Sequence, residues 1–171
     1  MAVTVADAAS GDLDAISDLW FRAQAARRPG SFVTIRDARA LVEQRAAQRG
    51  ASFVVALENE HMVGFAAAMP GREEDGRGKL APGLIHLGMV AVEPHEWGRG
   101  IGKLLVERSC ELGVQRGFRK MQLWTHADNV RAQRLYEGLG FTRSGRFKQD
   151  PRGETIVHYL RPLGAKFSRV S

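Results

Sequence analysis

The stretch LIHLGMVAVEPHEWGRGIGKLLVERSCELGVQ, residues Leu84 to Gln115, decides the fold. It opens with a nearly continuous apolar run, Leu84–Val92, which predicts a strand buried on both faces and ended by Pro94. It closes with apolar residues at helical spacing, which predict a helix from Ile101 to about Gln115 with Gly117 as its stop. Between the two lies a turn with three glycines. This order of elements indicates an α/β protein that binds a ligand at the turn.

The turn is suited to an anion. Gly98, Gly100 and Gly102 expose consecutive backbone N–H groups, and the helix N-terminus adds about half a positive charge behind them. The dinucleotide fingerprint would need glycine at Lys103, and the Walker A pattern would need glycine at Trp97, so neither fits. The turn therefore predicts another kind of phosphate-bearing ligand, and a turn that only reverses the chain stays open as the alternative.

The same signals, followed outward, predict the other elements. Gly71–Gly83, which is rich in glycine and charge, is expected to be an exposed loop. A helix capped by Ser10 is expected to end at Pro29-Gly30, and the strands Ser52–Leu57 and Met62–Ala68 are expected to form a hairpin. The remaining expected strands are Val3–Ala6, Lys120–Thr125, Phe141–Lys148 and Glu154–Leu160. The remaining expected helices are one at about Asp37–Gln48 and one capped by Asp128 or Asn129 and ended by Gly140. Their order predicts a mixed α/β fold with one layer of sheet and helices on both faces.

Composition narrows the class of protein. A chain of 171 residues with 44% hydrophobic and 26% charged residues predicts one compact domain and excludes disordered, collagen-like and coiled-coil classes. The net charge is +6, but from Arg143 onward seven basic residues face two acidic ones, a net +5. Because the basic charge belongs to this last segment, we do not expect nucleic acid to be a partner.

Cysteine usage and the first residues bear on the compartment. Cys110 is the only cysteine, so an intrachain disulfide and a cysteine zinc cluster are excluded, and its place in the predicted helix favours packing over a nucleophilic role. Met1 to Trp20 hold four aspartates and no Lys or Arg, the opposite of a signal peptide. The longest apolar run, Met62–Met69, is far shorter than a membrane span. We expect a cytoplasmic protein with no membrane partner.

A second block of residues points to a family. Asn129 and Ala132 precede the run L-Y-x-x-x-G-F, which is Leu135, Tyr136, Gly140 and Phe141 here. With the turn, this block resembles the GCN5-related N-acetyltransferase (GNAT) family, whose acyl-CoA signature is R/Q-x-x-G-x-G/A. In this chain the signature reads Trp97-Gly98-Arg99-Gly100-Ile101-Gly102, so the glycines match and Trp97 replaces the usual Arg or Gln.

The resemblance implies a fold and an activity. The fold would be a single mixed, mostly antiparallel central sheet with helices on both faces, with the acetyltransferase domain at 1–163 and a tail at 164–171. The activity would be transfer of an acetyl group from acetyl-CoA, as co-substrate, to a primary amine by direct attack in a ternary complex. The expected acceptor is a small molecule, and no metal is expected.

The resemblance also implies roles for particular residues. The backbone of β-strand residues before the turn would hold the pantetheine arm, the turn would hold the pyrophosphate, and two helix residues would add contacts; these are Met89, Val90, Val92, Trp97, Gly98, Arg99, Gly100, Ile101, Gly102, Lys103, Asn129 and Ala132. Tyr136 would contact the cofactor and protonate the leaving thiolate. His86 is the first candidate for the base that removes the amine proton. Glu93 is the second and would act through water.

Other interpretations stay open at this stage. The chain could be a non-catalytic acyl-CoA-binding regulatory module, although Tyr136 argues against this. It could instead acetylate a protein amine or an aminoacyl-tRNA. A homodimer is also left open.

Overall fold

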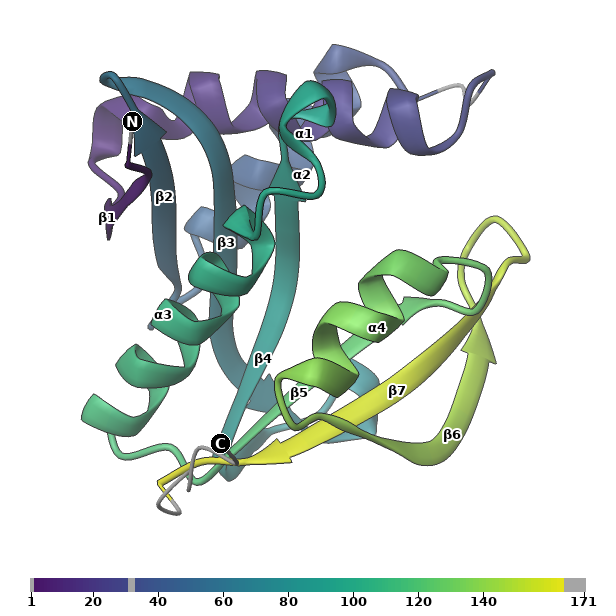
Figure 1. Ribbon diagram of the computed structural model, residues 1–171. Coiled ribbons are helices and arrows are strands. Elements are labelled where there is room, and N and C mark those ends of the chain that lie inside the picture. The colour runs from purple at the N-terminus through teal and green to yellow at the C-terminus, as the bar shows by residue number, and fades with distance from the viewer. Residues whose placement is uncertain (1, 31–32, 165–171) are drawn as a thin grey trace. The chain divides into compact units, whose positions relative to one another are not determined.

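The computed structural model describes residues 2–30 and 33–164, and the expected order of elements is confirmed (Figure 1). The strands are β1 (Thr4–Asp7), β2 (Ser52–Glu58), β3 (His61–Arg72), β4 (Leu80–Val92), β5 (Lys120–His126), β6 (Thr142–Gln149) and β7 (Thr155–Pro162). The α-helices are α1 (Leu13–Arg27), α2 (Ile35–Ala46), α3 (Ile101–Gln115) and α4 (Val130–Gly138). The strands form a seven-stranded mixed sheet in the order β1-β2-β3-β4-β5-β7-β6. β4 and β5 run parallel, whereas β1/β2, β2/β3, β5/β7 and β6/β7 are antiparallel pairs.

The chain forms two compact units. The first comprises Met1–Pro70 and Leu87–Ser109, and the second comprises Gly71–His86 and Cys110–Ser171, so β4 and α3 contribute to both. The domain boundary at residue 163 stays a prediction. Apart from Gly164, the predicted tail lies outside the described residues.

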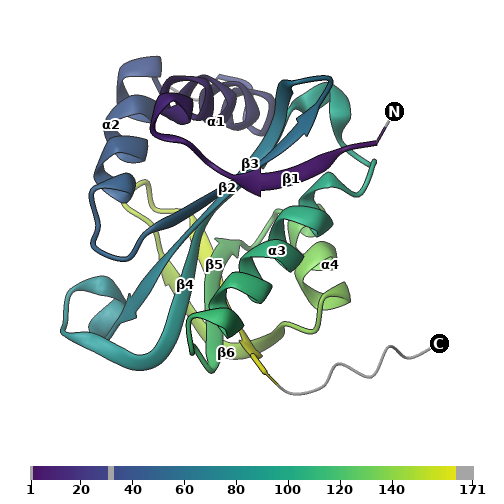
Figure 2. The ribbon, with the colours of Figure 1, turned by 90° about the vertical axis from the view of Figure 1, so that its left-hand side faces the viewer.

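The core of the first unit lies between its helices and one face of its strands. Figure 2 shows α1 and α2 on one side of β2 and β3 and α3 on the other. Ile16 and Leu19 of α1 and Val42 of α2 are buried against Phe65 and other strand residues. Because successive strand side chains point to opposite faces, Phe65 points toward α1 and α2, while its neighbour Gly64 belongs to the α3 face.

Gly64 lets α3 approach the sheet closely. A Cβ placed on Gly64 would lie 3.0 Å from both the Ala91 carbonyl oxygen and Leu105 Cδ1, and 3.2 Å from Ile101 Cγ2. Such distances are shorter than ordinary van der Waals contact, so a larger residue would push α3 away from the sheet. Gly64 therefore determines how closely the first residues of α3 lie to the sheet.

The second unit is built on β5, β7 and β6. The ring of Tyr136 on α4 contacts that of Tyr159 on β7, with centroids 6.4 Å apart, and the Tyr159 hydroxyl donates to Glu137 at 2.8 Å. These contacts pack α4 on the Tyr159 face of β7. The opposite face of the sheet carries Trp124 and His158, which are paired in register and whose rings lie 4.8 Å apart.

The expected loop at Gly71–Gly83 is wrong in its extent. β3 continues to Arg72 and β4 begins at Leu80, so the connection is only Glu73–Lys79. A Cβ on Gly71 would lie 2.6 Å from Leu84 Cγ, so this glycine permits close packing inside the sheet rather than a turn. Glycine and charged residues are typical of exposed loops, but here they also occur at the ends of two strands. Composition alone therefore predicted too long a loop.

Two smaller expectations also need correction. β4 is not buried on both faces, because Ile85, Leu87 and Met89 are buried while the residues between them are half-buried. Ser10 does not cap α1; it lies in a 3-10 turn, Ser10–Asp12, ahead of the helix. Continuous apolar sequence cannot distinguish a strand with one fully covered face from a strand with two.

The helices otherwise begin and end as their sequences favour. Thr34 caps α2 by accepting a hydrogen bond from the Asp37 N–H at 3.1 Å, while the Asp37 carboxylate accepts from the Thr34 N–H, a reciprocal capping box. α3 spans the predicted residues, and Cys110 within it is buried and lies 3.8 Å, sulfur to sulfur, from Met121. Among the described residues, no helix is long and apolar enough to cross a membrane.

Candidate active site

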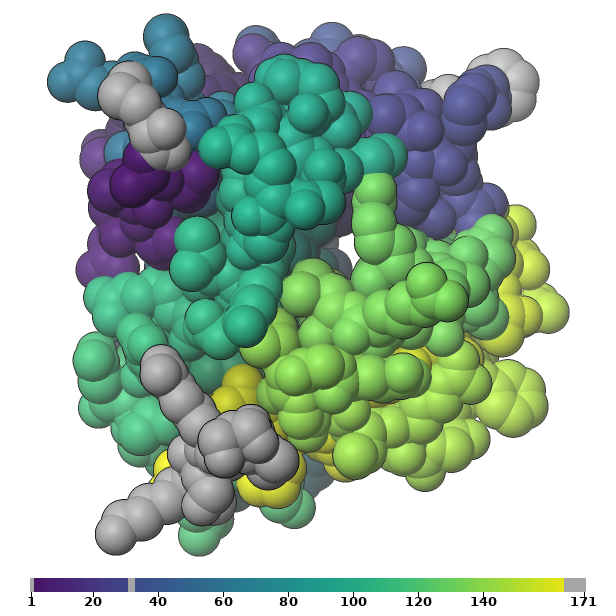
Figure 3. All heavy atoms as spheres, in the orientation of Figure 1, coloured from purple at the N-terminus to yellow at the C-terminus, as the bar shows by residue number. Residues whose placement is uncertain are grey.

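The turn between β4 and α3 has the backbone conformation that its glycines allow. Pro94–Glu96 form a short 3-10 helix, after which Gly98 and Gly100 have φ angles of +86° and +79°. These angles lie in the left-handed region that side chains disfavour, so glycine is required at both positions. Figure 3 shows the turn, in teal, on the surface of the molecule.

The turn presents main-chain amides. Among the described residues, the first amide after Gly98 to donate to a main-chain carbonyl is that of Leu104, which bonds to Gly100 at 3.2 Å. In the described part of the chain, the N–H groups from Gly98 to Lys103 have no main-chain carbonyl acceptor, so they are available to a ligand at the positive end of a fifteen-residue helix. No Cβ placed on Gly98 or Gly100 would meet another atom within 4 Å, so the space above the turn is open. This arrangement suits a phosphate or pyrophosphate group.

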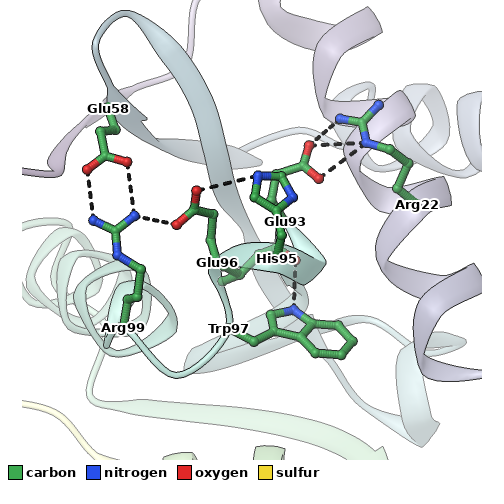
Figure 4. Close-up of polar contacts among 8 residues, drawn as sticks. Arg22, Glu58, Glu93, His95, Glu96, Trp97 and Arg99 are labelled. Atoms are coloured by element: carbon green, nitrogen blue, oxygen red, sulfur yellow. Dashed lines mark hydrogen bonds and ion pairs between the residues drawn. The ribbon is translucent and has the colours of Figure 1, made fainter.

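Two side chains tie the turn to strands β4 and β2 of its own unit (Figure 4). The Trp97 indole N–H donates to the Val92 carbonyl at 2.9 Å. Arg99 donates to both Glu58 oxygens at 2.9 and 2.8 Å and also to Glu96. Hydrogen bonds that Arg99 donates to Glu58 and then to Glu96 raise the pKa of Arg99, which stays charged. The Arg99 side chain is thus occupied by carboxylates, and any contact of Arg99 with a cofactor would come from its backbone.

Glu93, predicted as a base acting through water, has a partner that the sequence did not suggest. Arg22 Nε on α1 donates to the two Glu93 oxygens at 3.1 and 3.3 Å, and its Nη2 also donates to Glu93 (Figure 4). Glu93 is only 8% exposed. The hydrogen bond with Glu93 raises the pKa of Arg22. The Arg22 guanidinium thus holds the Glu93 side chain in place at the end of β4.

The predicted pantetheine strand is part of the same unit. Met89 is buried in the core on the face that α1 and α2 cover, whereas Val90 and Val92 are half-buried on the other face. The Val92 carbonyl already accepts the Trp97 indole, and the next amide, of Glu93, donates to Val63 at 2.9 Å. The main chain at Met89 and Val90 remains the predicted contact for an acyl-CoA.

The second unit carries the other predicted cofactor residues. The Asn129 side chain accepts a hydrogen bond from the Ala132 N–H at 3.2 Å, so Asn129 is the N-cap of α4. Tyr136, about two turns after Asn129, is 8% exposed, and its ring packs edge-on against Phe141 at 5.8 Å. Burial raises the pKa of the Tyr136 phenol, which therefore keeps its proton at neutral pH. Among the described residues, the phenol oxygen has no hydrogen-bond partner.

His86, the first candidate base, lies in the second unit. It is half-buried in β4, opposite Gln122 in the parallel register. The structure thus groups Glu93 with the turn and groups His86 with Asn129, Ala132 and Tyr136.

One group of side chains has the composition of a metal site. Single ligand atoms of His126, Asp150 and Glu154 lie within 4.8 Å of one another. Burial alone would raise the pKa of Asp150, but hydrogen bonds from His126 and from the Arg152 N–H outweigh burial and lower it. The hydrogen bond between His126 Nε2 and Asp150, at 3.1 Å, accounts for the close approach without a metal.

Comparison with known proteins gives the class of protein. The family model "Acetyltransferase (GNAT) family" matches residues 14–141, and the chain belongs to this family. N-acetyltransferase 8B of Rattus norvegicus is 35% identical over 100 residues, which cover 58% of this chain and 43% of the rat protein. The chain thus spans less than half the length of that relative.

Solved structures share the fold. The ribosomal-protein-S18-alanine N-acetyltransferase from Escherichia coli is 20% identical, with a TM-score of 0.73 over 99% of each chain. The structure of yncA from Salmonella typhimurium, with its cofactor acetyl-CoA, is 22% identical, with a TM-score of 0.73 over 96% of this chain and 95% of that one. At these identities the likeness establishes the fold.

Proposed function

We propose that the chain is an acetyl-CoA-dependent N-acetyltransferase that acetylates a primary amine, with a small molecule as the acceptor. The observation that carries the proposal is the turn Gly98–Lys103, whose amides point to a pyrophosphate-bearing ligand, in a chain of the GNAT family. Acetyl-CoA would supply the acetyl group as a reactive thioester. The residues present fit such a ligand, because no side chain fills the space above Gly98 and Gly100.

Each proposed role follows from local chemistry. The amides of the turn would hold the pyrophosphate, and the main chain of Met89 and Val90 would align the pantetheine arm and donate to the developing oxyanion. Tyr136 would give its proton to the departing thiolate, because the phenol is protonated at neutral pH. Asn129 would add a cofactor contact from the start of α4.

The base has two candidates that differ in their surroundings. Glu93 accepts hydrogen bonds from Arg22 and could accept the amine proton through a water molecule. His86 would accept the proton directly, because a neutral imidazole has a suitable affinity for it. Glu93→Gln and His86→Gln distinguish them, because only loss of the true base removes the acidic limb of the pH profile, the fall of kcat/KM at low pH.

The test is release of free thiol from acetyl-CoA with a panel of amines: polyamines, amino acids, aminoglycosides and peptides with free N-termini. Gly100→Glu should abolish acetyl-CoA binding by placing a carboxylate where the pyrophosphate would lie. Gly11→Glu adds the same charge at an exposed position with no atom within 4 Å and should have no effect.

The outcomes separate the alternatives. Thiol release that depends on a small amine supports the proposal, and release only with peptides assigns a protein amine instead, the kind of acceptor for which the E. coli neighbour is named. Acetyl-CoA binding without turnover supports a non-catalytic module. If the wild-type protein does not bind acetyl-CoA, the proposal is wrong.

A further inference from the structure

A cavity in the second unit is lined by positive charge. It has a volume of about 620 Å³ and lies against the start of β4, the start of β5 and the neighbouring residues of β6 and β7. Its polar lining includes Arg119, Lys120, Arg146 and His158, and Leu84 and Leu160 are among its apolar residues. Among the described residues that line it there is no carboxylate. The volume falls within the range of roughly 300–1,000 Å³ that is typical of small-molecule sites.

Main-chain hydrogen bonds hold Arg119 at the edge of this cavity. Its N–H donates to the Gly83 carbonyl and its own carbonyl accepts from the Leu163 N–H, both at 2.8 Å. Its side chain lies across Gly83, because a Cβ at that position would be 3.0 Å from Arg119 Nε. Gly83 also has a φ of +74°, so the glycine both permits the backbone conformation and leaves room for the guanidinium.

Among the residues that the structure describes, two of the three cations have no carboxylate partner. Arg119 and Lys120 are exposed, and within the described part of the chain neither side chain forms an ion pair. Arg146 differs, because it donates to Asp75 and lies 5.3 Å from the centroid of the Trp124 ring. Two uncompensated positive charges therefore face the cavity.

His158 forms an uncharged part of the cavity lining. It is 2% exposed, with Nδ1 2.7 Å from Ser144 Oγ and Nε2 3.0 Å from Gln122 Oε1. Burial, followed by the charge of Arg146, lowers its pKa, so it adds no charge at neutral pH. Its two hydrogen bonds fix the ring, so the positive charge of the cavity comes from the arginines and Lys120.

We propose that this cavity binds a compact dianionic group, a phosphate monoester or a dicarboxylate, on a ligand whose apolar part packs against Leu84 and Leu160. Guanidinium groups bind such oxyanions through paired N–H donors, and an ammonium adds a point charge. Two unpaired cations match two negative charges, and the apolar lining favours a ligand larger than an inorganic ion. The inference rests on this cavity alone and does not depend on acetyl transfer.

The test is calorimetric titration of the wild-type protein at constant ionic strength with phenyl phosphate, phthalate and, as a neutral probe, benzamide. At least one dianion should bind, and benzamide should not. Arg119→Gln/Lys120→Gln should weaken that binding by about tenfold or more, since it removes both unpaired charges. Gly83→Ala should weaken it as well, by displacing the Arg119 side chain.

The matched control is Arg134→Gln/Arg152→Gln, which removes the same charge from two exposed positions outside the cavity. Binding by this control should stay within about twofold of wild type, because distant surface charges are screened by salt. Whichever of phenyl phosphate and phthalate binds more tightly identifies the anion class. The proposal is overturned if neither dianion binds, if the Arg119/Lys120 variant binds like wild type, or if both double variants lose binding equally.

Discussion

Arg22 on α1 donates hydrogen bonds to both carboxylate oxygens of Glu93 at the end of β4, across 71 positions of sequence. Glu93 is buried, while the Arg22 side chain is half-exposed. The pair therefore joins the first helix to the strand end that precedes the glycine turn. It also means that a change at either residue alters both stability and the candidate site.

Removing Arg22 should be costly, because it leaves a buried carboxylate without its partner. We expect Arg22→Gln to lower the free energy of unfolding by about 1–3 kcal/mol, measured by urea denaturation. Arg39→Gln is the control, since its ion pair with Asp18 is 3.9 Å long and exposed, and it should cost no more than about 0.5 kcal/mol. Adding Glu93→Gln to Arg22→Gln should cost less than the sum of the two single changes. Equal losses in Arg22→Gln and Arg39→Gln would contradict the assignment.

Gly100→Ala should separate backbone strain from ligand binding. Its φ of +79° disfavours alanine by about 1 kcal/mol. Gly117→Ala, at the other end of α3 with a φ of +84°, should lose similar stability. Only Gly100→Ala should weaken acetyl-CoA binding, measured by calorimetry, because only its Cβ enters the space above the turn. Equal acetyl-CoA affinity in the two variants would argue against a cofactor role for the turn.

Trp97 should support the turn through the hydrogen bond from its indole N–H to the Val92 carbonyl. Trp97→Phe keeps an aromatic ring but removes the bond to the Val92 carbonyl, so we expect about 1 kcal/mol of lost stability and weaker acetyl-CoA binding. Trp20→Phe is a suitable comparison, since Trp20 packs edge-on against Phe65 in the core. That variant should bind acetyl-CoA as the wild type does. The expectation fails if Trp97→Phe retains full affinity.

Tyr136→Phe should affect turnover far more than stability. The ring contacts with Phe141 and Tyr159 remain, and the phenol oxygen has no protein partner to lose within the described residues. If the phenol protonates the thiolate, kcat should fall at least about 100-fold while the affinity for acetyl-CoA stays within a few-fold. An unchanged kcat would remove Tyr136 from the mechanism.

His158 should make stability depend on pH. The pKa of His158 is lowered in the folded protein from the ordinary histidine value of about 6.5. At a pH between these two values, the unfolded chain therefore binds more protons than the folded protein. Stability should therefore fall as the pH drops below about 6.5. His158→Gln should flatten that part of the profile in urea denaturation, whereas His95→Gln, at an exposed position, should not. Parallel profiles for wild type and His158→Gln would exclude this residue as the cause.

Local sequence predicted the elements well where one signal dominated. α3 matches its predicted bounds because apolar spacing and Gly117 agree, and Asn129 caps α4 as composition suggested. The predicted strands on either side of Gly71 were too short, because pairing across the sheet, rather than local preference, determines strand length. How far the second face of β4 is buried depends on what packs against that face, and no local sequence pattern shows this.

The candidate site could be predicted only in part. The glycines of the turn carry their own signal, because a positive φ at Gly98 and Gly100 is a property of the residue type. The partner of Glu93 could not be found, since Arg22 sits in a helix among other polar residues and is brought near only by the fold. The basic cavity is similar, because Gly83, Arg119 and His158 come from separate segments.

The burial of Cys110 has a practical consequence for labelling. The chain has one thiol, and it is 5% exposed, beside Met121. Reagents that react with accessible thiols should therefore modify the folded protein slowly. A cysteine introduced at an exposed position such as Arg134 would be the single fast-reacting site, so a fluorophore or spin label can be attached there without first removing the native residue.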